Sequence, residues 1–318
     1  MKIFVTGACG YQGSKLVPVL LKNNHKVIAL DTQWFGNFLQ KHKNLKIIKK
    51  NILNIKKNDL SNVDTIIHLA SIANDPMGEL KKEITWEISC LGTMKLIEKA
   101  IDNKVTKIIY ASSASVYGLK KEKKITETLS LEPISIYNKS KMITERTLLS
   151  YNKDINISII RPATVCGISP RMRFDLSVNM LTYQALKNKE ITVFGGNQIR
   201  PNIHLDDLIM IFLFFLKNKK KYNGIFNAGF ENLSILEIAN RVQKIVPCKI
   251  KIIKNVTDLR SYKIDSSKLL KLGFCPKKNI NHAINEIKDF YSKKINTIKP
   301  NSFSVNWLKK NQKNFFGI

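Results

Sequence analysis

The segment TGACGYQG, residues 6–13, decides the fold. It follows an apolar run predicted to be a strand and opens a helical pattern, which is the setting of a dinucleotide-binding loop. Gly7 allows a sharp turn, Gly10 lets the backbone approach a pyrophosphate, and Gly13 allows close packing of helix and strand. The start of the helix then offers free N–H groups and a positive dipole end to phosphates. A purely structural strand-to-helix turn is the less favoured alternative.

Short apolar runs alternate with helical patterns on both sides of this loop. Several runs, such as IIHLA and KIIYAS, are apolar at consecutive positions, as expected of parallel strands that helices cover on both faces. The alternation predicts an α/β fold with a Rossmann-type, doubly wound parallel sheet. The expected strands are Lys2–Thr6, Lys26–Asp31, Leu45–Lys49, Thr65–Leu69, Lys107–Ser112 and Asn156–Arg161.

The alternation of strands and helices loosens in the second half, where turn signals divide shorter elements. We therefore expect residues 1–168 to form the nucleotide-binding domain. Residues 169–318 are expected to form mainly a smaller α+β substrate domain and a tail, with some later segments returning to the first domain. The sequence leaves open whether the tail, from about Ile295, docks on the body.

The charge balance raises the question of a polyanionic partner. Lys and Arg outnumber Asp and Glu by 53 to 24, a formal net charge of +29, and such a surface attracts nucleic acid. The excess is mainly Lys, scattered through segments rich in Ile and Asn, without zinc-finger spacing or a basic stripe interleaved with aromatic residues. We therefore expect compositional bias and no specific nucleic-acid binding.

The cysteines and apolar runs indicate the compartment. The 5 cysteines lie far apart and form no C-x-x-C pair, so we expect free thiols in a reducing cytoplasm. The first residues run directly into the glycine turn, with no pattern of a secretory signal. The long apolar run Leu208–Leu216 is about half of the roughly 20 residues that span a bilayer. A cytoplasmic protein without a membrane partner is expected.

A carboxylate follows the second expected strand. Asp31 lies about 20 residues after the glycine loop, where it can accept hydrogen bonds from adenosine ribose hydroxyls. It would repel a 2′-phosphate, and no Arg occupies residues 32–35. The sequence therefore predicts NAD as the cofactor, with a capping or turn role for Asp31 as the alternative.

The spacing G-x-x-G-x-x-G resembles that of the short-chain dehydrogenase/reductase family. The length of the chain resembles the extended branch of that family, the nucleotide-sugar-modifying NAD-dependent epimerases and dehydratases. The resemblance covers most of residues 1–290, where four further segments follow in the family's order: HLAS (68–71), ASSASVYG (111–118), YNKSK (137–141) and RPATVCG (161–167). Besides the three glycines and Asp31, it implies cofactor contacts from Tyr11, Gln12, Asn51, Ile52, Leu69, Ala70, Ser71, Tyr137, Lys141 and Pro162.

Tyr137 and Lys141 form the core of the expected catalytic site. They lie four residues apart in a helical segment, and so on one face of the helix. A tyrosine has a pKa of about 10, and a nearby ammonium favours the phenolate, so we expect a lowered pKa for Tyr137. The resemblance implies that Ser113 holds the sugar oxygen while Tyr137 exchanges the proton and Lys141 reaches the cofactor ribose. Taken alone, this Tyr–Lys spacing is typical of an ordinary helix surface.

These roles imply the chemistry of the family. A sugar hydroxyl is oxidised to a ketone as hydride passes from the same carbon to the nicotinamide. If the ketosugar turns over in the site before the hydride returns, the configuration at that carbon is inverted. Family members with 4,6-dehydratase activity carry Asp and then Glu after the catalytic hydroxyl, whereas this chain has Ala114 and Ser115. Dehydration is therefore disfavoured, and the activity that the resemblance leads us to expect is that of a nucleotide-sugar epimerase, acting at carbon 4. Three departures from the family pattern are Ser89 for an Asn, Asn51 for an Asp and Cys166 for a Tyr.

Polar and basic side chains of the second half are the expected substrate ligands. The resemblance implies that Asn179 contacts the diphosphate or sugar and that Arg200 and Arg260 bind the diphosphate, for which a guanidinium fork is suited. Arg171 and Arg173 are further candidates, and a structural ion pair is the alternative for each arginine. The segments that carry this resemblance are RMRFDLSVN (171–179), GGNQIRPNIHLDD (195–207) and DLRSY (258–262).

Two other reactive side chains are expected to be structural. Cys166 fits a small buried residue better than a catalytic thiol. His204 lies beside two carboxylates in NIHLDD, but no second His has ligand spacing, so we expect a buried histidine at a helix start and no metal.

Competing functions remain open at this point. A reductase or 4-dehydrogenase acting on the same substrates would share every residue named so far. A non-catalytic, NAD-binding regulatory or RNA-associated protein fits the positive charge but has no need of an acid–base site. The resemblance also implies a homodimer formed by the helix of Tyr137 and one over about Glu83–Asn103, with Ile88, Leu91 and Ile143 as apolar positions.

Overall fold

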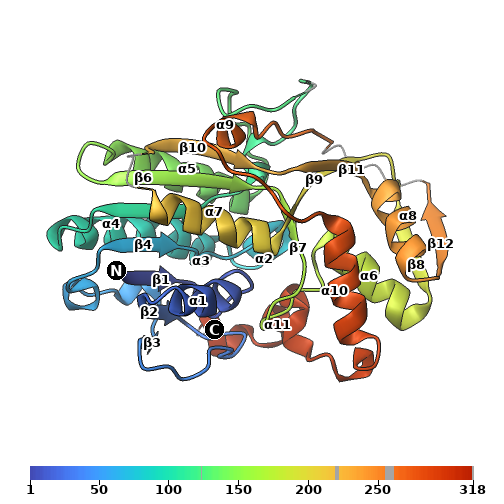
Figure 1. Cartoon of the computed structure of the whole chain (residues 1–318), viewed down its shortest axis with the longest axis horizontal. Helices are drawn as coiled ribbons and strands as arrows, with labels where there is room; N and C mark the ends of the chain where they lie inside the picture. The colour runs from blue at the N-terminus through green and yellow to red at the C-terminus, as the bar shows by residue number, and fades with distance from the viewer. Residues whose placement is uncertain (123, 219–221, 255–260, 317–318) are drawn as a thin grey trace.

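A parallel sheet forms the centre of the fold (Figure 1). The computed structural model describes residues 1–122, 124–218, 222–254 and 261–316. Seven strands pair in the order β10-β6-β5-β4-β1-β2-β3, and every pairing is parallel, which confirms the predicted fold class. The strands are β1 Lys2–Thr6, β2 Lys26–Asp31, β3 Leu45–Lys49, β4 Thr65–His68, β5 Lys107–Ala111, β6 Asn156–Pro162 and β10 Gly224–Ala228.

Helices cover both faces of this sheet, which explains the continuous apolar runs. On β1, Ile3 and Val5 pack in a core with α1 (Gly13–Lys22) and α7 (Leu205–Lys217). The intervening Phe4 packs on the other face, against residues of α4 (Gly92–Asp102) and α5 (Ile136–Ser150). Both sets of strand side chains are therefore buried, as parallel sheets require. The apolar run of residues 208–216 is part of the buried helix α7.

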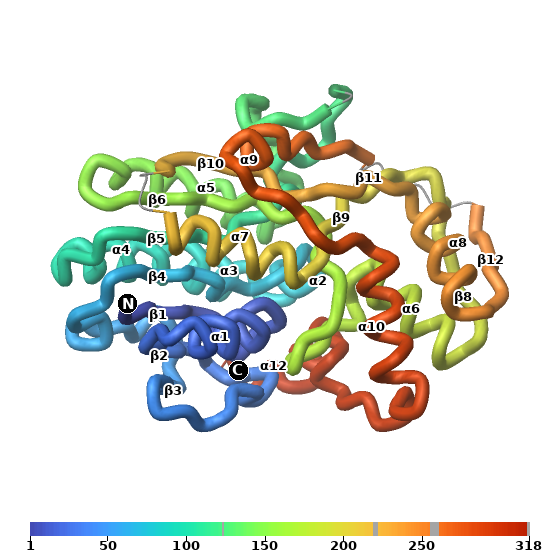
Figure 2. The backbone as a smooth tube through the Cα atoms, viewed as in Figure 1, coloured from blue at the N-terminus to red at the C-terminus, as the bar shows by residue number. Residues whose placement is uncertain are grey.

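The smaller part of the fold lies beyond the carboxyl ends of the strands (Figures 1 and 2). It holds a three-stranded sheet, β11-β9-β7, and a two-stranded sheet, β12-β8. Its core is continuous with that of α1 and α7, so the two parts share one cluster of buried side chains. Its elements are β7 Thr164–Cys166, α6 Ser177–Asn188, β8 Glu190–Phe194, β9 Ile199–His204, β11 Glu231–Ser234, α8 Ile235–Ile245, β12 Lys249–Ile253 and α10 Ile280–Tyr291.

The remaining helical segments connect these parts. One continuous helical stretch begins with α3 (Lys82–Trp86) and ends with α4, and the turn between them, Glu87–Leu91, is π-helical. Such a turn widens the helix locally and is often found near functional sites. The others are α2 Asp75–Gly78, α9 Ser267–Lys271, α11 Ser304–Lys310 and α12 Gln312–Phe316. Within the described ranges, no helix has both the length and the apolar character needed to cross a membrane.

The C-terminal tail docks on the nucleotide-binding part, a point that the sequence left open. The indole N–H of Trp307 in α11 donates to the carbonyl of Trp34, just after β2, at 2.7 Å. The Trp34 ring stacks on Phe315 with centroids 5.5 Å apart and meets Phe316 edge-on at 5.3 Å. Figure 2 shows α12 on the side of the fold that carries β2 and β3. Such aromatic pairs stabilise contacts beyond their buried area.

Glycines at the turn between β1 and α1 allow a backbone approach that no side chain could share. Gly7 has φ +67°, and a Cβ there would lie 2.8 Å from the backbone N of Ala70. A Cβ on Gly13 would lie 2.4 Å from the Gly7 carbonyl oxygen. A Cβ on Gly10 would meet only that same oxygen, at 3.2 Å. Gly7 and Gly13 are therefore required by the fold itself.

We predict that Gly13→Ala destabilises the protein strongly and that Gly10→Ala costs less. Overpacking of a tight site typically costs about 1–3 kcal/mol, and the Gly13 contact is with rigid backbone atoms. Urea unfolding of both variants without nucleotide measures the difference. Equal unfolding midpoints for the two variants would contradict this reading of the loop.

Candidate active site

Two adjoining cavities open at the carboxyl ends of the parallel strands, where open α/β sheets bind ligands. The first cavity brings together the glycine loop and the predicted cofactor residues that follow β2, β3 and β4. Of the sequence-predicted residues, its lining includes Gly7, Gly10, Tyr11, Gln12, Gly13, Asp31, Asn51, Ile52, Leu69, Ala70 and Ser71. Tyr11, Gln12, Leu69 and Ser71 also line the second cavity.

Asp31 ends β2 at the wall of the first cavity. Its carboxylate accepts hydrogen bonds from the backbone N–H groups of Cys9, at 2.9 Å, and Gln33, at 2.6 Å. Burial raises the pKa of Asp31, while these two hydrogen bonds lower it. Asn51 is fixed similarly, because its side-chain oxygen accepts from the N–H of Leu53 at 3.0 Å. Asp31 is thus oriented by its own loop and by the glycine loop, and Asn51 is oriented by its own loop.

The second cavity contains the residues predicted to be catalytic. Ser113, Tyr137 and Lys141 all line it, together with Pro162, an expected cofactor contact, and Arg200 from β9. Ser113 follows β5, Tyr137 and Lys141 lie in α5, and Pro162 ends β6. The structure therefore brings together these side chains from three segments of the first half, as the order of motifs predicts, with Arg200 from a fourth.

A short chain of hydroxyl and amide groups holds Ser113. Its Oγ accepts from the N–H of Ser115 at 3.2 Å and lies 2.8 Å from the Ser115 Oγ. The Ser115 hydroxyl donates to Asn138 Oδ1 at 2.5 Å. Asn138, directly after Tyr137, is buried and lines the same cavity. Sequence reasoning missed Ser115 and Asn138 as site residues, although both lie within recognised motifs, ASSASVYG (111–118) and YNKSK (137–141).

Burial dominates the electrostatics of Tyr137 and Lys141. Desolvation raises the pKa of Tyr137 to about 12, although a hydrogen bond with Ser113 lowers it. Desolvation lowers the pKa of Lys141 to about 7, although the charge of Glu145 raises it. The Lys141 ammonium donates to the Ala111 carbonyl at 2.8 Å and lies 5.9 Å from the centre of the Tyr137 ring. The expected lowering of the Tyr137 pKa by Lys141 is therefore not found in this geometry.

A buried ion pair lies directly behind the catalytic side chains. Arg161 donates from Nε and Nη2 to the two carboxylate oxygens of Glu145, at 2.9 and 2.6 Å. Ser112 also donates to Glu145, and Arg161 Nη1 donates to the hydroxyl of Tyr117 at 2.8 Å. That hydroxyl donates to Asn227 Oδ1 on β10 at 2.8 Å. The network therefore joins α5 to the ends of β5, β6 and β10.

The expected substrate ligands separate into three groups. Arg200 lines the second cavity, as predicted, and Arg260 lies outside the described residues. Asn179 is fully buried: its Oδ1 accepts from the Gly167 N–H at 3.0 Å, and its Nδ2 donates to the Arg173 carbonyl at 2.9 Å. These contacts position the loop after β7 instead of facing a ligand.

The two additional arginine candidates also differ from each other. Arg173 lines both cavities and forms a bidentate ion pair with Asp175, at 3.0 and 2.8 Å. Arg171 lines the first cavity, which holds the predicted cofactor residues, whereas the sequence suggested that it binds the substrate. The basic segment after β7 thus faces the nucleotide loop as well as the second cavity.

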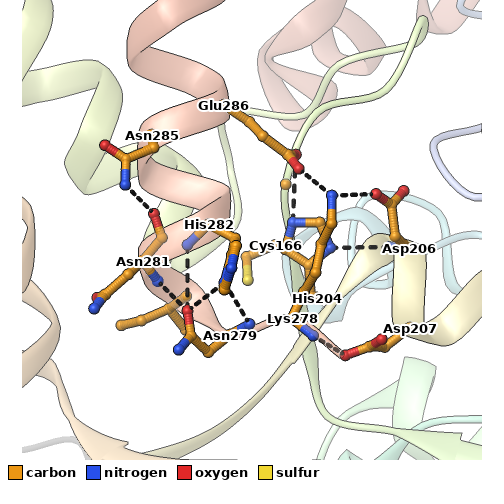
Figure 3. A network of polar contacts seen from close by, with 12 residues as sticks. Cys166, His204, Asp206, Asp207, Lys278, Asn279, Asn281, His282, Asn285 and Glu286 are labelled. Atoms are coloured by element: carbon orange, nitrogen blue, oxygen red, sulfur yellow. Dashed lines mark hydrogen bonds and ion pairs between the residues drawn. The ribbon is translucent and has the colours of Figure 1, made fainter. Parts of the chain in front are cut away.

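His204 lies in a polar network at the start of α7 (Figure 3). Its Nδ1 accepts from the Asp206 N–H at 3.1 Å, and its Nε2 lies 3.3 Å from a Glu286 oxygen. The Lys278 ammonium lies 2.7 Å from Asp206 and 2.5 Å from Glu286, and Lys15 pairs with Asp206 at 3.1 Å. These atoms have the types and spacing of metal ligands, but two ammonium groups already balance the carboxylates. The absence of a resident metal stays a prediction.

Cys166 is a buried structural residue in this setting. Its side chain is fully buried, and its thiol donates weakly to the Ile203 carbonyl at 3.5 Å. Desolvation raises the pKa of the thiol, and nearby carboxylates raise it further. A buried thiol with a raised pKa is a poor nucleophile, so the structure favours the predicted packing role.

A parallel sheet with a glycine loop, a terminal Asp on β2 and a Ser–Tyr–Lys group at its carboxyl edge defines a dinucleotide-dependent enzyme of the short-chain dehydrogenase/reductase class. The sequence model of the "NAD dependent epimerase/dehydratase family" matches residues 3–229. The chain belongs to this family, and it is an NAD-dependent enzyme.

Several known proteins resemble the chain over most of its length. An uncharacterized UDP-glucose epimerase of Bacillus subtilis is 33% identical over 77% of this chain and 82% of that protein. A UDP-glucose 4-epimerase of Lactobacillus helveticus is 28% identical over the same shares. The crystal structure of a UDP-glucuronic acid 4-epimerase from Bacillus cereus, with UDP-glucuronic acid and NAD, is 29% identical. It covers 92% of this chain and 100% of that one, with a TM-score of 0.80.

The first cavity fits NAD in its polar groups. The backbone at Gly10 and the start of α1 can face the diphosphate, and the Asp31 carboxylate can face the adenosine ribose. The buried Gln12 Oε1 and Arg171 Nε have no hydrogen-bond partner within the described part of the chain. Unpaired buried polar atoms are costly, so they indicate a polar ligand in this cavity.

We predict that Glu145→Met destabilises the protein by about 3–5 kcal/mol, because it leaves Arg161 buried without a counter-charge. The double variant Glu145→Met/Arg161→Met should recover most of the loss, since no buried charge remains. Arg241→Met, which breaks a more exposed pair with Glu231, should cost less than about 1 kcal/mol. Urea unfolding measures all three, and additive losses in the double variant would disprove the coupling.

Proposed function

We propose that the protein is a nucleotide-sugar 4-epimerase that acts by transient oxidation of the sugar. The observation that carries this proposal is the second cavity, where Ser113, Tyr137 and Lys141 meet beside the first cavity, whose polar groups fit NAD. The relatives support it, because the names of several describe 4-epimerases of UDP-sugars.

The roles of the three side chains follow from their contacts. NAD supplies the hydride acceptor when it is bound. The Ser113 hydroxyl, held by Ser115, orients the hydroxyl of the sugar. Tyr137 takes the proton from that sugar hydroxyl. Because burial raises the pKa of Tyr137, the phenolate needs a nearby positive charge. Lys141 lies buried one helix turn after Tyr137. The charge of Glu145 raises the pKa of Lys141 and so favours its ammonium form.

Two features favour epimerisation over the alternatives within the family. The positions after Ser113 are Ala114 and Ser115, so the cavity lacks the carboxylic acid pair that dehydration requires at these positions. A net dehydrogenase or reductase must exchange its nicotinamide cofactor in every turnover. The docked tail and the loop after β7 both line the first cavity and bond to its walls, which favours a retained cofactor.

We propose that Arg200 and Arg260 bind the substrate's diphosphate. Arg200, on β9, lines the second cavity together with the catalytic side chains of α5. A guanidinium can form two parallel hydrogen bonds to phosphate oxygens. Asn179 is left out of this proposal, because its amide is used inside the protein.

We predict that the protein interconverts a UDP-hexose and its 4-epimer without net formation of NADH. Tyr137→Phe should reduce the rate by about 10²–10⁴-fold, the usual contribution of a general acid–base group, and should still bind NAD. Tyr151→Phe, on a tyrosine just after α5 that lines neither cavity, is the matched control. NMR of the sugar anomeric protons measures conversion, and NADH absorbance measures net oxidation. Stoichiometric NADH would assign the protein to the dehydrogenases instead.

A homodimer is proposed through α5 and the helical stretch that ends in α4. Leu91 and Met94, three residues apart, are 43% and 40% exposed on that stretch, and Ile143 of α5 is partly buried. Ile88, expected on the same apolar face, is instead buried in the core of its own chain. Apolar residues at this spacing suit a twofold helix bundle.

We predict a dimer mass by light scattering at micromolar concentration, and a monomer mass for Leu91→Glu/Met94→Glu. Two buried carboxylates without partners would oppose the association. Leu270→Glu changes a similarly exposed leucine on α9 and should leave the dimer intact. A monomeric wild-type protein would rule out this interface.

A further inference from the structure

Arg171 is a buried cation that the proposed reaction does not use. Its side chain is 3% exposed and lines the first cavity. Its Nη2 donates to the Ser304 hydroxyl at 2.8 Å, and its guanidinium stacks on the Phe35 ring at 4.0 Å. Its Nε has no partner, and within the described ranges no carboxylate lies at ion-pair distance from it. A buried cation that lacks an ion pair and a full set of hydrogen bonds is destabilising, so an anionic ligand in this cavity would stabilise Arg171.

The neighbouring Arg173 differs from Arg171 in having a carboxylate partner. Arg173, two residues on, forms two hydrogen bonds with Asp175. Arg171 instead donates to a neutral hydroxyl. Burial and the charge of Arg173 lower the pKa of Arg171, and the more distant carboxylates of Asp175 and Asp31 oppose this shift. Of the two arginines, Arg171 is therefore the one without an ion pair.

The loop that carries Arg171 is fixed over the first turn of α1. The hydroxyl of Tyr11 donates to the Gly167 carbonyl at 2.6 Å, and the hydroxyl of Ser169 donates to the Tyr11 carbonyl at 2.7 Å. The N–H of Arg171 itself donates to the hydroxyl of Ser14 at 3.2 Å. The backbone of Arg171 therefore lies against the helix start that offers N–H groups to a diphosphate.

The C-terminal tail holds the other side of this arrangement. Ser304, fully buried at the start of α11, bonds Arg171 and also lies 3.4 Å from Asp175. Asn301 donates to the Phe35 carbonyl at 2.7 Å, next to the Trp34 carbonyl that Trp307 contacts. One segment, residues 301–307, thus fixes both the arginine and the aromatic ring on which it stacks.

We propose that Arg171 binds the diphosphate of NAD and that residues 301–307 hold it in place, so that the second half of the chain locks the cofactor. The second half then contributes to the cofactor site as well as to the substrate site. The proposal rests on NAD dependence and not on the sugar that is transformed, so it can hold for any member of this family with the same contacts.

The test compares ligands with and without phosphates on protein stripped of nucleotide. Arg171→Met should weaken NAD and ADP by roughly 10–100-fold in Kd, the range for hydrogen bonds to a charged group, and leave adenosine unchanged. Arg171→Lys should lie between, because it keeps the charge without the fork. Arg241→Met removes the same charge from a distant, more exposed site and should change nothing. Calorimetric titration measures each Kd.

Thermal unfolding separates binding from a structural role. Without nucleotide, Arg171→Met should unfold at the same or a higher temperature than wild type, because it removes an unpaired buried charge. With saturating NAD it should gain less stability than wild type does. Loss of NAD and adenosine affinity by the same factor, unchanged NAD affinity, or a nucleotide-free variant that is less stable or fails to fold would overturn the proposal.

Discussion

The buried ion pair between Glu145 and Arg161 determines where the catalytic groups stand. Both side chains are about 2% exposed, so each charge is balanced by the other and not by solvent. Glu145 lies one helix turn after Lys141, and Arg161 directly precedes Pro162 at the end of β6. Because Ser112 shares the same carboxylate next to Ser113, a single interaction aligns α5 with two strand ends. Buried pairs of this kind favour one geometry over alternatives more than they add net stability.

Burial sets the protonation of the site, with opposite effects on its two titrating groups. It raises the pKa of Tyr137 and lowers that of Lys141, although the charge of Glu145 raises the Lys141 pKa. A neutral Tyr137 can hold a substrate hydroxyl but cannot remove its proton. A positive charge added beside Tyr137 would favour its phenolate. Catalytic competence is therefore expected to depend on the bound, oxidised cofactor, whose nicotinamide ring is cationic.

The first half of the chain could be predicted closely because its signals are local. The first six strands of the central sheet were predicted to within one residue at each end, and the three catalytic side chains meet as expected. The seventh strand, β10, pairs with β6 across more than sixty residues, a contact that no local pattern encodes. The same reason explains why Arg171 was assigned to the substrate and why Asn179 was expected at a ligand. Their roles depend on a loop and a tail that are distant in sequence.

The most direct test of oxidation and re-reduction at one carbon follows the hydrogen itself. A UDP-hexose carrying deuterium at carbon 4 is incubated with the purified protein and NAD, and the epimer is analysed by NMR and mass spectrometry. Return of the same hydride predicts an epimer that keeps its deuterium at carbon 4, with no label lost to water. Loss of the deuterium to solvent, or an inverted centre elsewhere in the sugar, would contradict the mechanism.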